Sequence, residues 1–208
     1  ELGIPPDRTF ETKIALGLKM VKRVKAKGVP FDLLACDALY GRDSQFRADL
    51  AAENVQYAAQ VPADTLVYLS EPRVGIPPKW GQRGRPRTRL RVLSGQRPQE
   101  VRALAQHPQT AWQRVQVRLT ERGWLTADFA VRRVWTVAAG QRPRAEWLVM
   151  RRNSEGAGSY TLLNAPTDTK QACLIASSCR RYFTERTFED AKTEIGWDEF
   201  QAQKYRAW

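Results

Sequence analysis

The chain has 208 residues, with 34 Lys plus Arg against 22 Asp plus Glu and a single His, which gives a formal net charge of +12. A hydrophobic content of 42% is typical of a globular chain, and the length suffices for one or two domains with a buried core. The sequence contains no apolar run of about eighteen residues, the length that would predict a membrane span. The single His disfavours most zinc sites and His-dependent triads, and three Cys without a CxxC pair suggest a reducing compartment.

The excess positive charge lies in the middle of the chain. Residues 1–61 have a net charge of +1, residues 62–152 of +12 and residues 153–208 of −1. In the middle segment 17 of the 18 cationic residues are Arg, whose planar guanidinium suits bidentate contacts with phosphate or guanine. No acidic residue occurs from Arg73 to Gln99. A solubilising surface in an Arg-rich proteome is the plain explanation, but the balanced flanks favour a segment that binds a polyanion.

The first sixty residues predict alternating helices and strands. Apolar residues at helical spacing predict a helix over 9–27, with Thr9 as its cap and Gly28 at its end. The apolar run 31–37 predicts a buried strand with Asp37 at its carboxyl end, where open α/β sheets place ligands. The next predicted elements are a turn at 40–42, a helix from Asp43 or Ser44 to about Glu53, and a strand over 55–61.

Residues 62–152 differ in character from the flanking parts. Pro and Gly are frequent up to Pro86, which disfavours long regular elements there, and alternating patterns further on predict half-exposed strands. A β-rich insertion is therefore predicted over 62–152. The predicted strands are 115–120, 129–137, 147–151 and 159–163, the last two paired across a turn at 153–158.

A long helix is predicted over 168–194, capped by Asp168 or Thr169 and ended by Gly196. Residues 199–208 predict the start of another helix.

Four residues of the 168–194 helix form a stripe. Arg181, Glu185, Phe188 and Lys192 are spaced 4, 3 and 4 residues apart, which places them on one helix face. Taken alone, the stripe is explained by a partly exposed face with an ordinary Arg181–Glu185 ion pair.

The stripe also matches a known signature. Its Arg-x3-Glu-x6-Lys spacing resembles the core of the Tyr-x2-Arg-x3-Glu-x6-Lys motif of DDE transposases from bacterial insertion sequences. The string 36–41, Cys-Asp-Ala-Leu-Tyr-Gly, resembles the turn at their second catalytic Asp, and 147–152 and 160–166 resemble their approach to the Glu helix. The chain is most similar to the insertion-sequence 701 family, related to the insertion-sequence 4 group. Two features depart from the family pattern. Ser178 stands where the signature has Tyr, and no Asp before Asp37 matches the first catalytic Asp of the family.

The resemblance implies an α/β fold with an RNase H-like catalytic core that is incomplete at its N-terminus. Residues 1–61 and 153–208 would form this core, and 62–152 the basic β-rich insertion between the second Asp and the Glu. The resemblance also implies that Asp37 and Glu185 are catalytic and hold Mg²⁺ or Mn²⁺ ions for attack on a phosphodiester. Glu189 and Glu194 lie nearby, and only the spacing of the signature selects Glu185.

The resemblance further implies DNA contacts by Arg181 and Lys192. Residues 83–86, Arg-Gly-Arg-Pro, match the core of an AT-hook, although a flexible phosphate-binding loop is the plainer interpretation. The side chains predicted to bind DNA are Arg181, Lys192, Arg83, Arg85, Arg87 and Arg89.

The predicted function is metal-dependent DNA cleavage and strand transfer in transposition, by a partial chain that lacks the first catalytic Asp. The alternative is a non-catalytic DNA-binding remnant of a decayed transposase. The expected partners are double-stranded transposon ends and a second copy of the chain on DNA, in the bacterial cytoplasm near the nucleoid and away from membranes. A third interpretation is an unrelated Arg-rich RNA-binding protein. It would require that both the stripe and the Asp37 turn match the transposase motifs by chance.

Overall fold

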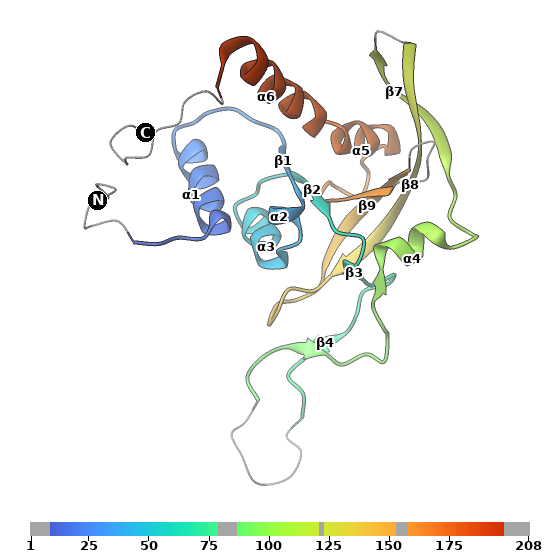
Figure 1. The fold of residues 1–208 in the computed structure, drawn as a ribbon. Helices are drawn as coiled ribbons and strands as arrows, with labels where there is room; N and C mark the ends of the chain where they lie inside the picture. The colour runs from blue at the N-terminus through green and yellow to red at the C-terminus, as the bar shows by residue number, and fades with distance from the viewer. Residues whose placement is uncertain (1–8, 79–86, 121–122, 153–157, 198–208) are drawn as a thin grey trace.

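The computed structural model describes residues 9–78, 87–120, 123–152 and 158–197. Its main sheet consists of β1 (Leu34–Cys36), β2 (Tyr57–Val61), β7 (Gln113–Thr120), β8 (Gly123–Thr136), β9 (Arg144–Arg152) and β10 (Gly158–Leu163). These six strands lie in the order β1-β2-β10-β9-β8-β7 (Figure 1). Only β1 and β2 are parallel, and the other neighbours are antiparallel. The predicted mixed α/β class is confirmed.

The elements before the middle segment follow the prediction closely. The helices are α1 (Lys13–Ala26), α2 (Ala38–Gly41) and α3 (Ser44–Ala52). Asp43 caps α3 as predicted, whereas α1 is capped by Thr12 and not by Thr9. The predicted turn at 40–42 is wrong in detail, because Asp37 caps a short helix, α2, that already begins at Ala38.

The middle segment holds strands of the main sheet and two small ribbons. The ribbons are β3 (Leu66–Val67) paired with β6 (Gln99–Glu100), and β4 (Val74–Gly75) paired with β5 (Arg91–Val92), with α4 (Val101–Gln106) after β6. β7, β8 and β9 continue the sheet that β1, β2 and β10 begin. The domain boundaries at residues 61 and 152 stay a prediction. None of the described helices is long and apolar enough to cross a membrane.

The predicted long helix over 168–194 is wrong, because the chain forms two helices, α5 (Gln171–Ser178) and α6 (Arg181–Ile195). At the junction the Cys179 and Arg180 N–H groups donate to carbonyls three residues back, at 3.1 and 3.3 Å. The Ser178 hydroxyl also donates to the Ile175 carbonyl at 2.7 Å, a local bond that competes with regular helix. Lys170, not Asp168 or Thr169, holds the cap position of α5, while Gly196 ends α6 as predicted. The helix predicted over 199–208 lies outside the described residues.

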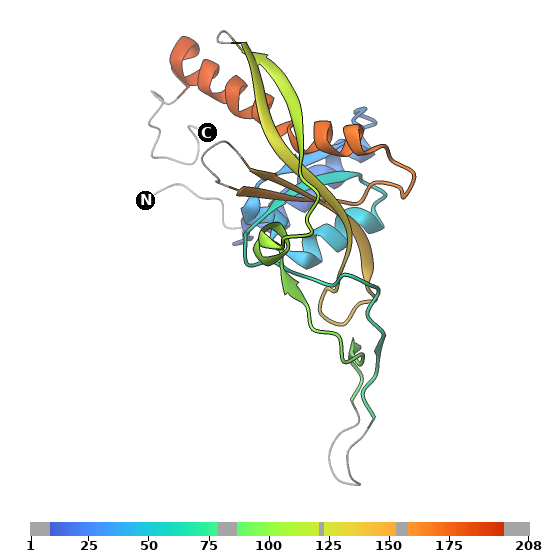
Figure 2. The same ribbon diagram turned by 90° about the vertical axis from the view of Figure 1, so that its right-hand side faces the viewer.

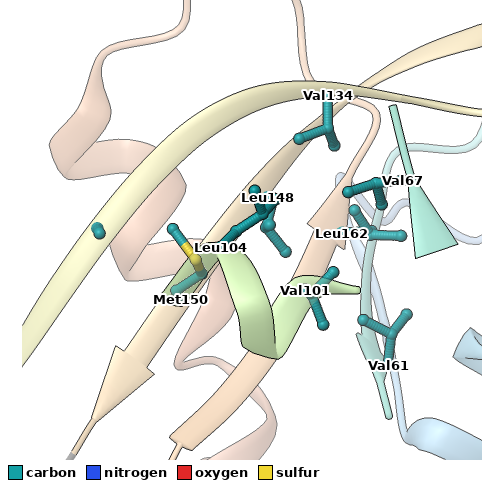
Figure 3. Packing of buried hydrophobic residues seen from close by; sticks show 9 residues of the cluster. Val61, Val67, Val101, Leu104, Val134, Leu148, Met150 and Leu162 are labelled. Atoms are coloured by element: carbon teal, nitrogen blue, oxygen red, sulfur yellow. The ribbon is translucent and has the colours of Figure 1, made fainter. Parts of the chain in front are cut away.

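The two faces of the sheet are packed by different helices. Along β9, Leu148 belongs to the cluster beneath α4 and Val149 to the cluster beneath α5, because successive side chains of a strand point to opposite faces. Figure 3 shows the first of these clusters, whose labelled members are Val61, Val67, Val101, Leu104, Val134, Leu148, Met150 and Leu162. A third cluster joins α1 and α3 to β1 and β2.

A buried ion pair links α3 to β9. The Arg47 Nε lies 3.1 Å from Glu146 Oε1, and both side chains are almost completely buried. Tyr57 donates to Glu146 at 2.6 Å, and Thr136 also donates to this carboxylate. Burial and the charge of Glu146 raise the pKa of the Tyr57 phenol, so it remains a donor. Arg47 additionally donates to the Gly41 carbonyl and so fixes the end of α2.

Removing one member of the buried ion pair is expected to be costly. Glu146→Ala leaves the Arg47 guanidinium buried without its counter-charge, so we expect the free energy of unfolding to fall by about 3–5 kcal/mol. Glu146→Gln keeps an acceptor for Tyr57 and should lose less. Urea unfolding followed by Trp fluorescence measures both.

Asp190→Ala is the matched control, because Asp190 forms an exposed pair with Arg186 on α6. The expected change for an exposed helical pair is about 0.5 kcal/mol. Equal losses for the buried and exposed variants would contradict the structural role of Glu146.

Candidate active site

Asp37 lies at the carboxyl end of β1, where the strand turns into α2. Its Oδ1 accepts hydrogen bonds from the backbone N–H groups of Leu39 at 2.9 Å and Tyr40 at 3.3 Å. The preceding residue, Cys36, is buried in the cluster that joins α1 and α3 to β1 and β2. Burial, with the charge of Asp37 as a smaller cause, raises the pKa of the Cys36 thiol to about 12.

Tyr40 and Gly41 hold this turn in place. The Tyr40 ring packs close to Gly17 of α1, where an added Cβ would lie 2.9 Å from Cε1. Its centroid lies 5.5 Å from that of Phe46 in α3. An added Cβ at Gly41 would lie only 1.8 Å from the Gln60 carbonyl oxygen in β2. The Tyr-Gly pair after Asp37 therefore has a packing role, because α2 lies directly against β2 only with glycine at this position.

The predicted stripe lies on α6, which is exposed along most of its length, with Ala191 as its single buried residue. Arg181 donates to the Gln60 side chain of β2 and forms an ion pair with Glu185 at 2.6 Å. The Glu185 side chain is 57% exposed. The ion pair that the spacing alone predicts is thus present, and Arg181 attaches the first turn of α6 to the sheet.

Asp37 and Glu185 line one cleft, although 148 positions separate them in the sequence. The cleft has a volume of about 400 Å³ and lies between α1, β1, the start of α2 and α6. Gly17 and Met20 form its α1 side, and Phe188 its α6 side. The fold therefore brings together the two carboxylates that the sequence singled out. Their catalytic role stays a prediction.

The other predicted DNA contacts are placed apart from this cleft. Lys192 is exposed on α6, almost two turns beyond Glu185, and is not among the cleft-lining residues. Arg87 and Arg89 are exposed in the described stretch before β5, and the β4–β5 ribbon lies at the end of the molecule opposite α6 (Figures 1 and 2). Arg83 and Arg85 lie outside the described residues.

The cleft residues have the chemistry of a partial site for a hard cation. Carboxylate oxygens suit Mg²⁺, which commonly keeps several waters and binds one or two carboxylates together with substrate phosphates. Asp37 and Glu185 fit that requirement in donor type and number. Among the described residues, however, no group of three or more His, Cys, Asp or Glu side chains is arranged to hold a metal ion.

Sequence reasoning missed the residues that support the site. Arg47, Gln60 and Glu146 lie apart in the sequence and belong to no recognisable motif. Their side chains nevertheless hold α2 and the start of α6 in place. One signal was available for Glu146, a charged residue followed by the apolar run Trp147–Met150 within a strand, because a charge at such a position requires a buried partner.

The charged residues that line the cleft are Asp37, Glu185 and Arg181, and most of the other lining residues are apolar. A sequence profile of DDE superfamily endonucleases matches residues 1–123, more than half of the chain. The chain therefore belongs to the DDE superfamily endonucleases. A comparison with curated proteins finds no match. The matched stretch contains Asp37 and its turn, whereas Glu185 lies beyond it and reaches the cleft through the fold.

The close approach at Gly41 leads to a prediction about the Asp37 turn. Gly41→Ala forces α2 away from the Gln60 carbonyl, so we expect the free energy of unfolding to fall by about 1–3 kcal/mol. Gly95→Ala is the matched control, because nothing lies within 4 Å of an added Cβ there. Thermal or urea unfolding distinguishes the two variants, and a neutral Gly41→Ala would contradict the described packing.

Proposed function

We propose that the chain is the main part of the catalytic domain of an insertion-sequence transposase, which cleaves DNA and joins the cut ends to a target in a Mg²⁺-dependent reaction. One observation carries this proposal: in a DDE superfamily endonuclease, Asp37 and Glu185 line the same cleft from separate elements. The motifs around both residues favour the insertion-sequence 701 family. An RNase H-like core with a β-rich insertion is part of this proposal.

In the proposed site Asp37 and Glu185 hold the divalent metal. When bound, the metal neutralises charge on the scissile phosphate and its leaving oxygen. The Asp37 Oδ1 already accepts two backbone hydrogen bonds, so Oδ2 would be the oxygen available to the metal. Arg181 orients Glu185 from one helical turn away and keeps a positive charge beside the path of the DNA. Lys192 contacts a phosphate further along α6.

We further propose that this chain is partial and that the first catalytic Asp comes from outside it. β1 is the last strand at one end of the main sheet, so its outer edge has no strand partner among the described residues. An unpaired strand edge can accept a further strand. A strand added there would enter the cleft beside Asp37 and supply the third carboxylate. Pairing of two copies on the transposon ends, close to the nucleoid, also belongs to the proposal.

The second candidate function is a DNA-binding remnant without cleavage activity. The observation that favours it is the Arg181–Glu185 ion pair, which occupies one of the two carboxylates in the described state. Metal binding separates the two candidates, because a remnant has no need to retain a site that binds a cation.

The proposal predicts that metal binding depends on both carboxylates. Mn²⁺ titrated into the 208-residue chain and followed by electron paramagnetic resonance should bind at one weak site. Asp37→Asn and Glu185→Gln should each weaken this binding about 10-fold or more, because each removes a ligand charge. Glu189→Gln is the control, since Glu189 lies on the same helix, pairs with Arg186 and is not among the residues that line the cleft.

Equal weakening by Glu189→Gln, or no effect of Asp37→Asn, would contradict the proposed site. If the unsubstituted chain binds DNA but binds no Mn²⁺, the result favours the DNA-binding remnant.

A further inference from the structure

The segment that projects between β3 and β6 is a cationic surface. We name it the β4–β5 arm and define it as residues 70–78 and 87–97 of the described chain. It points away from the body at the end opposite α6 in both views (Figures 1 and 2). Its five exposed cations are Arg73, Arg87, Arg89, Arg91 and Arg97, and its one acidic residue is Glu71.

The arm has a defined backbone but little core. Val74 pairs with Val92 and Gly75 with Arg91, and the Leu93 N–H donates to the Arg73 carbonyl at 2.8 Å. The Gln96 side chain donates to Ser70 at 2.9 Å across the base of the arm. No residue of the ribbon strands β4 and β5 is fully buried. A two-stranded ribbon of this kind gains little stability from packing in water, so burial of apolar area does not account for the projection.

The charges of the arm have no partners among the described residues. None of its five Arg side chains forms an ion pair there, unlike Arg114 and Arg152, which both pair with Asp128 in the sheet. A two-stranded β-ribbon fits the major groove of B-DNA, and Arg binds phosphate and guanine through its planar fork. Shape and charge thus both match a nucleic acid duplex.

We propose that the β4–β5 arm binds double-stranded DNA at a segment separate from the one in the Asp37–Glu185 cleft. The separation follows from the position of the arm, because the cleft adjoins α6 and the arm leaves the opposite end of the molecule (Figure 2). This binding extends the contact with DNA beyond the cleavage site. It requires neither metal nor the two carboxylates, so it stands independently of the proposed catalytic function.

The test compares two pairs of neutralising substitutions in the 208-residue chain. Binding of a fluorescent 30-bp duplex of about the length of a short operator is measured by anisotropy at several NaCl concentrations, with EDTA present to exclude metal. Arg87→Gln with Arg89→Gln removes two arm charges. Lys13→Gln with Lys170→Gln removes the same charge from the exposed starts of α1 and α5, outside the arm.

The arm variant should lower the slope of log K against log[salt] by about 1.8, because each lost phosphate contact contributes about 0.9. The control pair should leave the slope unchanged. Equal slopes and affinities for the two variants would overturn the inference. Equal or tighter binding of a double-stranded RNA of the same sequence, lost in the arm variant, would overturn the assignment to DNA.

The cleft variants separate this inference from the proposed function. Asp37→Asn with Glu185→Gln should lose the Mn²⁺ site, whereas the arm variant should retain it. If the arm variant binds DNA like the unsubstituted chain while the cleft variant loses Mn²⁺ binding, only the proposal for the arm is overturned. If the arm variant loses DNA binding while the cleft variant still binds Mn²⁺, the proposal for the arm stands and the catalytic assignment is overturned.

Discussion

The buried Arg47–Glu146 ion pair is the constraint on which the geometry of the cleft depends. Burial of two charges is costly, and such a pair is tolerated only where further hydrogen bonds satisfy both groups. Tyr57 and Thr136 donate to Glu146, and the Gly41 carbonyl accepts from Arg47. The pair therefore connects β9, β2 and α3 to the end of α2. Since Asp37 caps the other end of α2, its carboxylate is positioned by charges that lie inside the protein.

The two sides of the cleft differ in how closely they pack against the rest of the protein. Asp37 belongs to a turn that packs against β2 so closely that only Gly41 fits, whereas Glu185 lies on a helix with a single buried residue. The contact from Arg181 to Gln60 is a polar link between α6 and the sheet. Elements with few buried contacts open at low free-energy cost. The α6 side is thus the part of the cleft that moves at the lower free-energy cost.

Local sequence patterns were sufficient for most elements, whereas the two carboxylates that line the cleft were selected by the resemblance to DDE transposases. Apolar patterns located α1, β2 and the paired strands β9 and β10, and the cap at Asp43 located α3. Arg181, Glu185 and Lys192 all lie on α6. The break between α5 and α6 was missed, because hydrophobic periodicity continues through it while Ser178 and its neighbours form tight local hydrogen bonds. The partnership of Arg47 with Glu146 was not predictable, since it joins residues 99 positions apart through the sheet order.

The central claim is that Asp37 and Glu185 form one metal-binding site. Anomalous diffraction from crystals of the chain grown with Mn²⁺ tests it most directly. The account predicts a peak in the cleft, with oxygen atoms of both carboxylates about 2.0–2.6 Å from the ion, the range of carboxylate bonds to hard divalent cations. A peak on the outer face of α6 at Glu189 or Asp190, with Asp37 and Glu185 unliganded, would contradict the account.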